Sequence, residues 1–215
     1  VKQLLDLGYK EIVLTGIHTG FYGIDLKNIN LVNLLEAILQ RNEKNDFRIR
    51  LSSLEPLEVN DKLINLIKSE DKLCSHLHIP LQSGSNKVLK DMNRRYGREY
   101  YRELVMKIAE EIPRAAIATD VMVGFPTEEE EDFKDTFDLI NELPLTHFHI
   151  FKYSKRPGTK AYNLKSMVST KEKNYRGQEL LNLANKKQEV FLKDNLGRNM
   201  RVLTEQKTGT DKYKG

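Results

Sequence analysis

Residues 115–143 read AAIATDVMVGFPTEEEEDFKDTFDLINEL, and this stretch holds one complete copy of the unit that decides the fold. Its first part is apolar and β-branched as far as Gly124, which predicts a buried strand over 115–124. Its second part repeats apolar residues at helical spacing, which predicts a helix over 128–143. A strand joined to a helix by a short turn is the building unit of parallel β/α folds.

Five acidic residues in a row, 128–132, begin the second part. Such a run suits a metal site, a partner-binding segment or a helix start. Thr127 and Glu130 have the spacing of a capping box, and the helix dipole favours acidic side chains in the first turn. We therefore interpret the run as a helix start. Only Glu128, the acid nearest the strand end, keeps a functional interpretation.

The same alternation runs through most of the chain. We predict further strands over 11–16, 47–53, 76–82, 146–154 and 199–206. We predict further helices over 30–40, 59–70, 86–92, 98–112 and 170–195. Since little room is left for hairpins, the first five strands are expected to be parallel, in a barrel or an open sheet. The strand over 199–206 has no helix after it and is expected to begin a second, small β domain.

Composition excludes several classes of protein. Of the 215 residues, 39% are hydrophobic and 31% charged, which suits a globular chain, and no apolar run approaches the length of a membrane span. A single cysteine, Cys74, fits a reducing cytoplasm and excludes a multi-cysteine metal site within this chain. Residues 171–215 carry 11 basic and 6 acidic side chains. That excess indicates either an anionic partner such as nucleic acid or a solvated helix face.

In parallel β/α folds, ligands bind at the carboxyl ends of the strands. All five predicted strand ends contain Gly, Pro or Ser, and four of them add polar side chains. They lie at residues 15–18, 52–56, 80–85, 123–126 and 153–159. Any one such turn means little, but five together predict a ligand site at this end of the fold.

Three other patterns in the sequence could form a site. His76 and His78 alternate on one predicted strand, as do His147 and His149 on another, so each pair could ligate a metal, as in a metal-dependent barrel hydrolase. Gly84 and the Gly in RPGT could present N–H groups to a phosphate, but neither fits a known phosphate loop. The basic residues of 93–98 suit either an anion or a solvated turn.

The sequence motifs at the strand ends give more specific information about the fold and the function. LTGIHTGFYG (14–23), IRLSSLEP (49–56), HIPLQSGSNKVLKDMNRRY (78–96), TDVMVGFPTEEEEDF (119–133) and FHIFKYSKRPGTKA (148–161) occur in this order. Together they closely resemble the radical S-adenosylmethionine methylthiotransferases, which add a methylthio group to tRNA adenosines or to a ribosomal protein. The first motif is most similar to the branch that acts on threonylcarbamoyladenosine in tRNA.

The resemblance implies a fold and two domains. The fold would be α/β, a partial (β/α)6 radical S-adenosylmethionine barrel whose first strand precedes residue 1. The barrel would cover residues 1–196. Residues 197–215 would begin a small β domain of the RNA-binding TRAM type.

The resemblance also implies which residues bind the cofactor. Thr15 and Gly16 match the segment that holds the methionyl amino group of S-adenosylmethionine, and Ser53 and Glu55 would face the same pocket. The remaining matches concern the ribose, carboxylate and adenine groups. They are Gln82 and Ser83 at the ribose and methionyl carboxylate, Arg95 as a carboxylate partner, Val123, Gly124, Phe125 and Pro126 against the adenine, and Tyr153 and Ser154 closing the pocket. Gly124 is expected to let a flat adenine lie close to the backbone.

One part of the family pattern is absent from this sequence. The family holds a catalytic [4Fe–4S] cluster on a Cys-x-x-x-Cys-x-x-Cys loop and a second cluster in another domain. Cys74 cannot replace three thiolates, so no catalytic or metal-binding residue is predicted here. The resemblance therefore implies that this chain supplies the cofactor- and substrate-binding part of the enzyme and is inactive alone.

The function expected from the resemblance is methylthiolation of a modified adenosine in tRNA. The expected partners are tRNA and S-adenosylmethionine, with no membrane, in a cytoplasmic monomer. The alternatives are the metal-dependent hydrolase and a non-catalytic RNA-binding module. Zinc binding by the histidine pairs would favour the first. RNA binding without affinity for S-adenosylmethionine would favour the second.

Overall fold

The computed structural model describes residues 1–165, 168–210 and 212–214. Five strands form its centre. They are β1 (Glu11–Leu14), β2 (Arg48–Leu51), β3 (His76–His78), β4 (Ala116–Val123) and β5 (His147–Lys152). All pair in parallel, as the alternation of strands and helices predicts.

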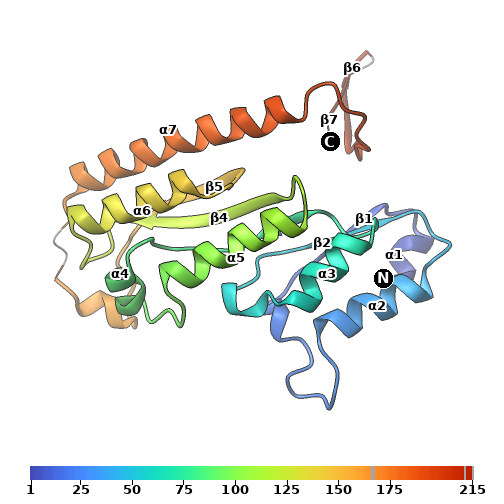
Figure 1. Ribbon diagram of the computed structural model, residues 1–215, viewed down its shortest axis with the longest axis horizontal. Helices are drawn as coiled ribbons and strands as arrows, with labels where there is room; N and C mark the ends of the chain where they lie inside the picture. Colours follow the sequence, from blue (N-terminus) through green and yellow to red (C-terminus); the bar gives the residue numbers. More distant parts are fainter. Residues whose placement is uncertain (166–167, 211, 215) are drawn as a thin grey trace.

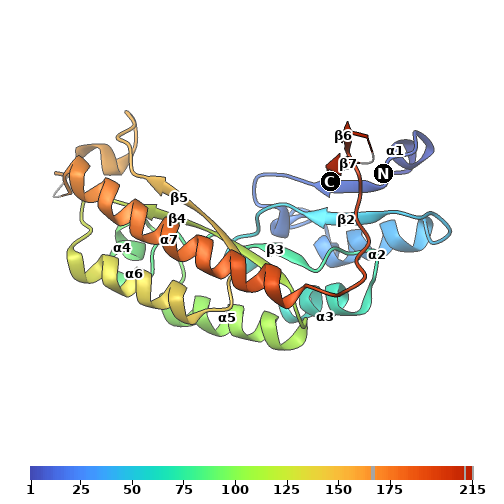
Figure 2. The ribbon, with the colours of Figure 1, turned by 90° about the horizontal axis from the view of Figure 1, so that it is seen from above.

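The strands lie side by side in chain order, β1 to β5 (Figures 1 and 2). Strands β1 and β2 form one continuous ladder, and β3, β4 and β5 form another. A parallel bridge between Ile49 and Leu73 links β2 to the segment before β3. At that junction the Ile49 N–H donates to the Lys72 carbonyl at 2.7 Å, and the Cys74 N–H donates to the Ile49 carbonyl at 2.9 Å. All five strand ends therefore face the same edge of the molecule.

Helices cover one face of this sheet (Figure 2). They are α2 (Leu31–Arg41), α3 (Asp61–Ser69), α4 (Asn86–Asp91), α5 (Arg98–Glu111) and α6 (Glu130–Glu142), preceded by the short α1 (Lys2–Asp6). Alternate strand residues such as Ile49, Leu77 and Ile117 are almost fully buried against them. Short 3-10 turns occupy Thr19–Phe21, Pro56–Glu58 and Lys160–Asn163.

The other face of the sheet carries the intervening residues, and most of these are polar. Glu11 accepts hydrogen bonds from both Arg48 and Arg50 on the neighbouring strand. His78 and Asp120 continue this row on β3 and β4. We call this surface the open face, because its side chains are less buried than those that contact the helices.

The start of α6 corrects one local prediction. The N-cap residue is Glu129, whose N–H donates to the Asp132 carboxylate at 2.8 Å. The capping box predicted from Thr127 and Glu130 is wrong, because the Thr127 hydroxyl donates to Asp91 at 2.6 Å instead. The helix therefore begins two residues later than the sequence predicts.

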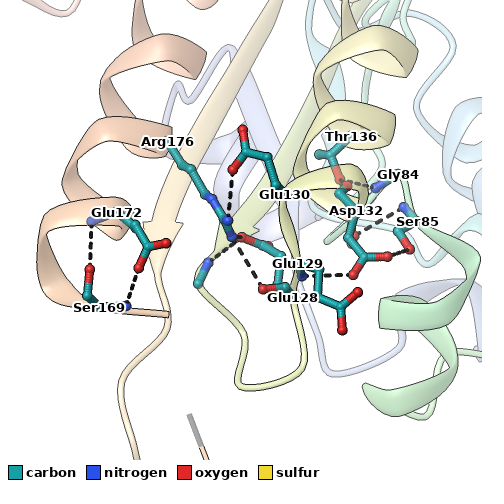
Figure 3. A network of polar contacts seen from close by, with 12 residues as sticks. Gly84, Ser85, Glu128, Glu129, Glu130, Asp132, Thr136, Ser169, Glu172 and Arg176 are labelled. Carbon is teal, nitrogen blue, oxygen red and sulfur yellow. Dashed lines mark hydrogen bonds and ion pairs between the residues drawn. The ribbon is translucent and has the colours of Figure 1, made fainter. Parts of the chain in front are cut away.

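The last helix, α7 (Thr170–Asp194), packs along β5, the strand at the opposite end of the strand order from β1 (Figures 1 and 2). A capping box fixes its start, since Glu172 N–H donates to the Ser169 hydroxyl and Ser169 N–H donates to the Glu172 carboxylate, at 3.2 and 2.8 Å (Figure 3). Leu180 and Leu183 bury the apolar side of the helix.

The strand predicted over 199–206 is wrong, because residues 199–205 have no regular structure. An antiparallel hairpin follows instead, formed by β6 (Gln206–Gly209) and β7 (Lys212–Lys214). It lies near the end of the molecule that holds β1 and the N-terminus (Figure 1), where Arg201 pairs with Asp46 at 2.7 Å. Whether this hairpin begins a TRAM-type domain stays a prediction, as does the closure of the sheet into a six-stranded barrel. Among the described residues, no helix is both long and apolar enough to cross a membrane.

Candidate functional site

A hollow of about 480 Å³ lies at the carboxyl ends of β4 and β5. Four residues predicted for the site line it, from three separate segments: Gln82, Phe125, Tyr153 and Ser154. The other predicted residues lie outside its lining. They are Thr15, Gly16, Ser53, Glu55, Ser83, Arg95, Val123, Gly124 and Pro126.

Gln82 lies in a backbone conformation that few residues adopt. Pro80 follows β3 and has no N–H, and the Leu81 N–H donates to the Thr119 hydroxyl at 2.9 Å rather than to a strand carbonyl. The chain returns to the sheet at Gln82, whose N–H donates to the Asp120 carbonyl and whose φ is +68°. A non-glycine residue with positive φ indicates a position that its surroundings strongly determine.

The turn after β4 is held in the left-handed region. Gly124 has a φ of +74°, and its N–H donates to the Glu128 carboxylate at 2.9 Å. A Cβ at this position would lie 2.4 Å from Lys173 Cγ, so the stem of Lys173 covers the side of Gly124 that we expected to be open. The Lys173 ammonium lies over the Tyr153 ring, which meets Phe125 edge to face with ring centroids 5.4 Å apart.

Glu128 is buried in an ion pair that ties this turn to α7 (Figure 3). Its carboxylate accepts from Arg176 at 2.6 Å, and the two side chains are only 2% and 3% exposed. Burial raises the pKa of Glu128, while the hydrogen bonds from Gly124 and Arg176 act in the opposite direction. Arg176 also donates to Glu130 at 3.1 Å. Glu128 therefore holds the strand end in place and is not exposed to a ligand.

A second network ties the segment after β3 to α6 (Figure 3). The Gly84 N–H donates to the Thr136 hydroxyl at 2.9 Å, and the Ser85 hydroxyl donates to Asp132 at 2.6 Å. The Ser83 hydroxyl lies 3.2 Å from that of Thr136 and is fully buried. The structure therefore places the Ser83 side chain in the support of the site and not at its surface.

Arg94 lines the hollow, whereas the residue predicted from the sequence is its neighbour Arg95. One Arg94 nitrogen lies 2.9 and 3.0 Å from the two carboxylate oxygens of Glu55. Arg95 is exposed, and no ion pair joins it to another residue in the described part of the chain. For two adjacent arginines in a turn, the sequence does not show which side chain points toward the hollow.

The first two strand ends do not line the hollow, although Glu55 of the second one pairs with Arg94. Thr15 and Gly16 are exposed after β1. Ser53 lies after β2, and its hydroxyl is 2.9 Å from His78 Nδ1. The predicted contact of these residues with the same ligand as Gln82 stays a prediction.

The histidine pairs do not form two separate clusters. One member of each pair, His78 and His149, lies beside Asp120 of β4, at 2.9 and 3.1 Å from the same carboxylate oxygen. Burial lowers the pKa of His76 to about 4, and its Nδ1 has no hydrogen-bond partner among the described residues. His147 donates to or accepts from His149 at 3.1 Å.

Comparison with curated proteins finds relatives among tRNA-modifying enzymes. The chain is 45% identical over 183 residues to the threonylcarbamoyladenosine tRNA methylthiotransferase MtaB of Bacillus subtilis, covering 85% of this chain and 40% of that protein. The MtaB of Aquifex aeolicus is 43% identical and is covered to 52%, with 99% of this chain aligned. A tRNA-2-methylthio-N(6)-dimethylallyladenosine synthase of Clostridium tetani is 42% identical, with 100% of this chain aligned and 47% of that protein covered. The chain thus spans about half the length of the curated relatives it matches.

Solved structures support the fold at much lower sequence identity. Coproporphyrinogen III oxidase from Escherichia coli, described as a radical SAM enzyme, superposes with a TM-score of 0.58 at 19% identity, over 73% of this chain and 37% of that one. The Elp3 protein of Methanocaldococcus infernus gives 0.54 at 17% identity, over 85% and 47%.

The family comparison covers more than half of the chain. The model of the Radical SAM superfamily matches residues 1–140, which include β1 to β4 and the turn at Gly124. The parallel sheet, the hollow at its strand ends and this match agree, and the chain belongs to the radical SAM superfamily.

Proposed function

We propose that this chain is the cofactor- and substrate-binding part of a tRNA methylthiotransferase, and that the modified nucleoside is N6-threonylcarbamoyladenosine. The observation that carries the proposal is the hollow in which Gln82, Phe125, Tyr153 and Ser154 meet at the strand ends. The names of the relatives from Bacillus subtilis and Aquifex aeolicus support the choice of nucleoside.

The residues of the hollow fit S-adenosylmethionine. Its volume lies within the range of small-molecule sites, and the Arg94 guanidinium suits a carboxylate such as that of the methionyl group. The rings of Phe125 and Tyr153 offer flat apolar surface for an adenine. When bound, this cofactor supplies the radical chemistry of the superfamily, and the residues of this chain hold and orient it.

Unlike S-adenosylmethionine, an iron–sulfur cluster does not fit the residues of this chain. Cys74 is its single cysteine, and burial raises the pKa of that thiol, which disfavours the thiolate that a cluster requires. Cys74 also lies before β3, at the opposite end of the strands from the hollow. We therefore assign no cluster ligand and no redox step to these residues.

The charge of the hollow supports a substrate with a carboxylate. Arg156 and Lys160 line it, and no carboxylate in the described part of the chain pairs with either cation. A threonylcarbamoyl group carries a carboxylate, whereas a dimethylallyl group is apolar. Unpaired cations stabilise the carboxylate of a threonylcarbamoyl group and do not stabilise an apolar dimethylallyl group.

Calorimetry with S-adenosylmethionine tests the cofactor site. Gln82→Gly removes the side chain while glycine retains the positive φ, so the fold should persist and affinity should fall about two- to tenfold. Asn28→Gly is the matched control, because Asn28 also has a positive φ, of +58°, but lies outside the hollow. Equal affinity in the two variants, or no binding by the parent chain, would contradict the assignment.

Binding of stem-loop RNA that carries the modified nucleoside tests the choice of nucleoside. The loop that contains threonylcarbamoyladenosine should bind more tightly than the loop that contains dimethylallyladenosine. Arg156→Gln should remove most of that difference, and Arg198→Gln, an exposed arginine outside the hollow, should leave it intact. If both loops bind equally well, the dimethylallyladenosine branch is the better assignment.

The two alternatives make different predictions in the same assays. A non-catalytic RNA-binding module would bind RNA in a salt-dependent way without affinity for S-adenosylmethionine. A metal-dependent hydrolase has no support from the superfamily match, and the histidines do not group as that hypothesis required.

A further inference from the structure

Three side chains from three neighbouring strands converge on the open face. His78 ends β3, Asp120 lies within β4, and His149 lies opposite Asp120 in the β4–β5 register. One ligand atom from each of these residues lies within 4.8 Å of the others. The convergence follows from the parallel register and does not depend on a loop.

Both imidazole rings are held from behind. His78 Nδ1 lies 2.9 Å from the Ser53 hydroxyl, and His149 Nε2 lies 3.1 Å from His147 Nε2. With a proton on each of these outer nitrogens, His78 Nε2 and His149 Nδ1 present lone pairs toward Asp120. Support of this kind, from a partner on the second ring nitrogen, is typical of histidines that ligate a metal.

The spacing of the inner atoms suits a metal ion. The Asp120 oxygen lies 2.9 Å from His78 Nε2 and 3.1 Å from His149 Nδ1. Two ligands of a tetrahedral zinc ion, each at about 2.1 Å, are about 3.4 Å apart, so each nitrogen needs to separate from the Asp120 oxygen by only about 0.5 Å or less to admit the ion. Two imidazoles with one carboxylate favour a divalent transition metal over magnesium or calcium.

We propose that His78, Asp120 and His149 bind a divalent transition-metal ion such as zinc. The His149 side chain is 52% exposed, so the ion keeps open coordination positions on the open face. Met122 and Phe151, two residues further along β4 and β5, line the hollow. The open positions are therefore available to an oxygen donor of a molecule bound there. This site is independent of the proposed methylthiotransferase function.

Calorimetric titration of the 215-residue chain with zinc tests the site. We expect one ion per chain, with affinity lowered at least about tenfold by Asp120→Asn and by His149→Ala. His18→Ala is the matched control, because His18 pairs with Glu58 and lies outside the cluster. Its affinity should equal that of the parent chain.

Several results would overturn the site. Absence of stoichiometric zinc, or equal affinity in Asp120→Asn and the parent, would leave a hydrogen-bonded His–Asp–His row without metal. Circular dichroism establishes that each variant folds. If His149→Ala does not fold, His147→Ala removes only the outer partner of His149 and should weaken zinc binding by about tenfold or more. An unchanged affinity in that variant counts against the proposal. Cofactor affinity, measured separately, reports on the hollow and not on this cluster.

Discussion

At the residue scale, the buried pair of Glu128 and Arg176 connects the turn after β4 to the last helix. The two groups lie 2.6 Å apart and are nearly free of solvent. Arg176 also lies over the Phe133 ring, 5.5 Å from its centroid. Removing one partner of such a pair leaves a buried charge without compensation.

Arg176→Ala should therefore destabilise the chain by about 3–5 kcal/mol in urea unfolding. Arg102→Ala is the control, because Arg102 pairs with Glu142 at the surface, where a pair contributes about 0–1 kcal/mol. Similar losses in the two variants would show that the Glu128–Arg176 pair does not stabilise the turn.

Gly124 allows backbone strain to be separated from side-chain contact. Gly124→Ala places a Cβ at a positive φ and against Lys173, whereas at Gly158, with φ of +82°, no atom of the described residues lies within 4 Å of an added Cβ. Strain alone costs about 1–2 kcal/mol at each position, so Gly124→Ala should cost more. Thermal unfolding measures the difference, and adding Lys173→Ala should reduce it. Equal costs would mean that Lys173 moves aside freely.

The part of the candidate site that lies at the strand ends could be predicted from the sequence. Gln82, Phe125 and Tyr153 lie at the hollow because parallel strands bring their carboxyl ends to one edge. The choice of Arg94 over Arg95 depends on the turn conformation, and the burial of Ser83 depends on Thr136, which is 53 residues away. No local pattern reports such contacts.

At the element scale, α6 anchors the segment between β3 and α4. Asp132 of α6 accepts hydrogen bonds from Ser85 and Lys87, and Thr136 accepts one from the Gly84 N–H. Burial raises the pKa of Asp132, but the hydrogen bonds from Ser85, Glu129 N–H and Lys87 outweigh it and hold that pKa below its usual range.

This carboxylate gives a pH dependence with a definite sign. Because the pKa is lower in the folded chain, its stabilisation is complete above the unfolded value of about 4 and is lost as pH falls through the folded value. Asp132→Asn should cost about 1–3 kcal/mol at pH 7, and the difference from the parent should shrink below about pH 4. Unfolding followed over a pH series measures this. Asp138→Asn, at an exposed position of the same helix, is the matched control, and a constant difference for Asp132→Asn would refute the prediction.

The hydrophobic periodicity of the sequence predicted most of the helices and strands, but it did not predict where each one begins and ends. The helix start predicted at Thr127 moves to Glu129, because Thr127 bonds to Asp91. The strand predicted over 199–206 failed because its apolar residues, such as Met200 and Val202, are exposed rather than paired in a sheet. A short apolar run without a partner strand has nothing to hold it extended.

At the scale of the whole molecule, β1 is an edge strand with exposed apolar side chains around it. Val13, Ile17 and Ile24 are 52%, 95% and 82% exposed. An unprotected edge with apolar neighbours favours pairing with another chain.

The chain should therefore self-associate as its concentration rises. Val13→Lys places a charge on the edge strand and should reduce the association measured by sedimentation or light scattering. Leu192→Lys on α7, at a position that is 58% exposed, adds the same charge away from the edge. An equal effect of both variants would point to net charge and not to the edge.

The chain-order arrangement of β1 to β5 also has a consequence for biosynthesis. Each strand pairs with the one made just before it, so each pairing requires only the unit that has just been completed. A growing polypeptide can add each unit to a finished edge as it leaves the ribosome. The hollow, which joins residues from Gln82 to Ala161, is complete only after β5 and the turn that follows it have been added. The ligand site is thus among the last parts of the nascent sheet to appear.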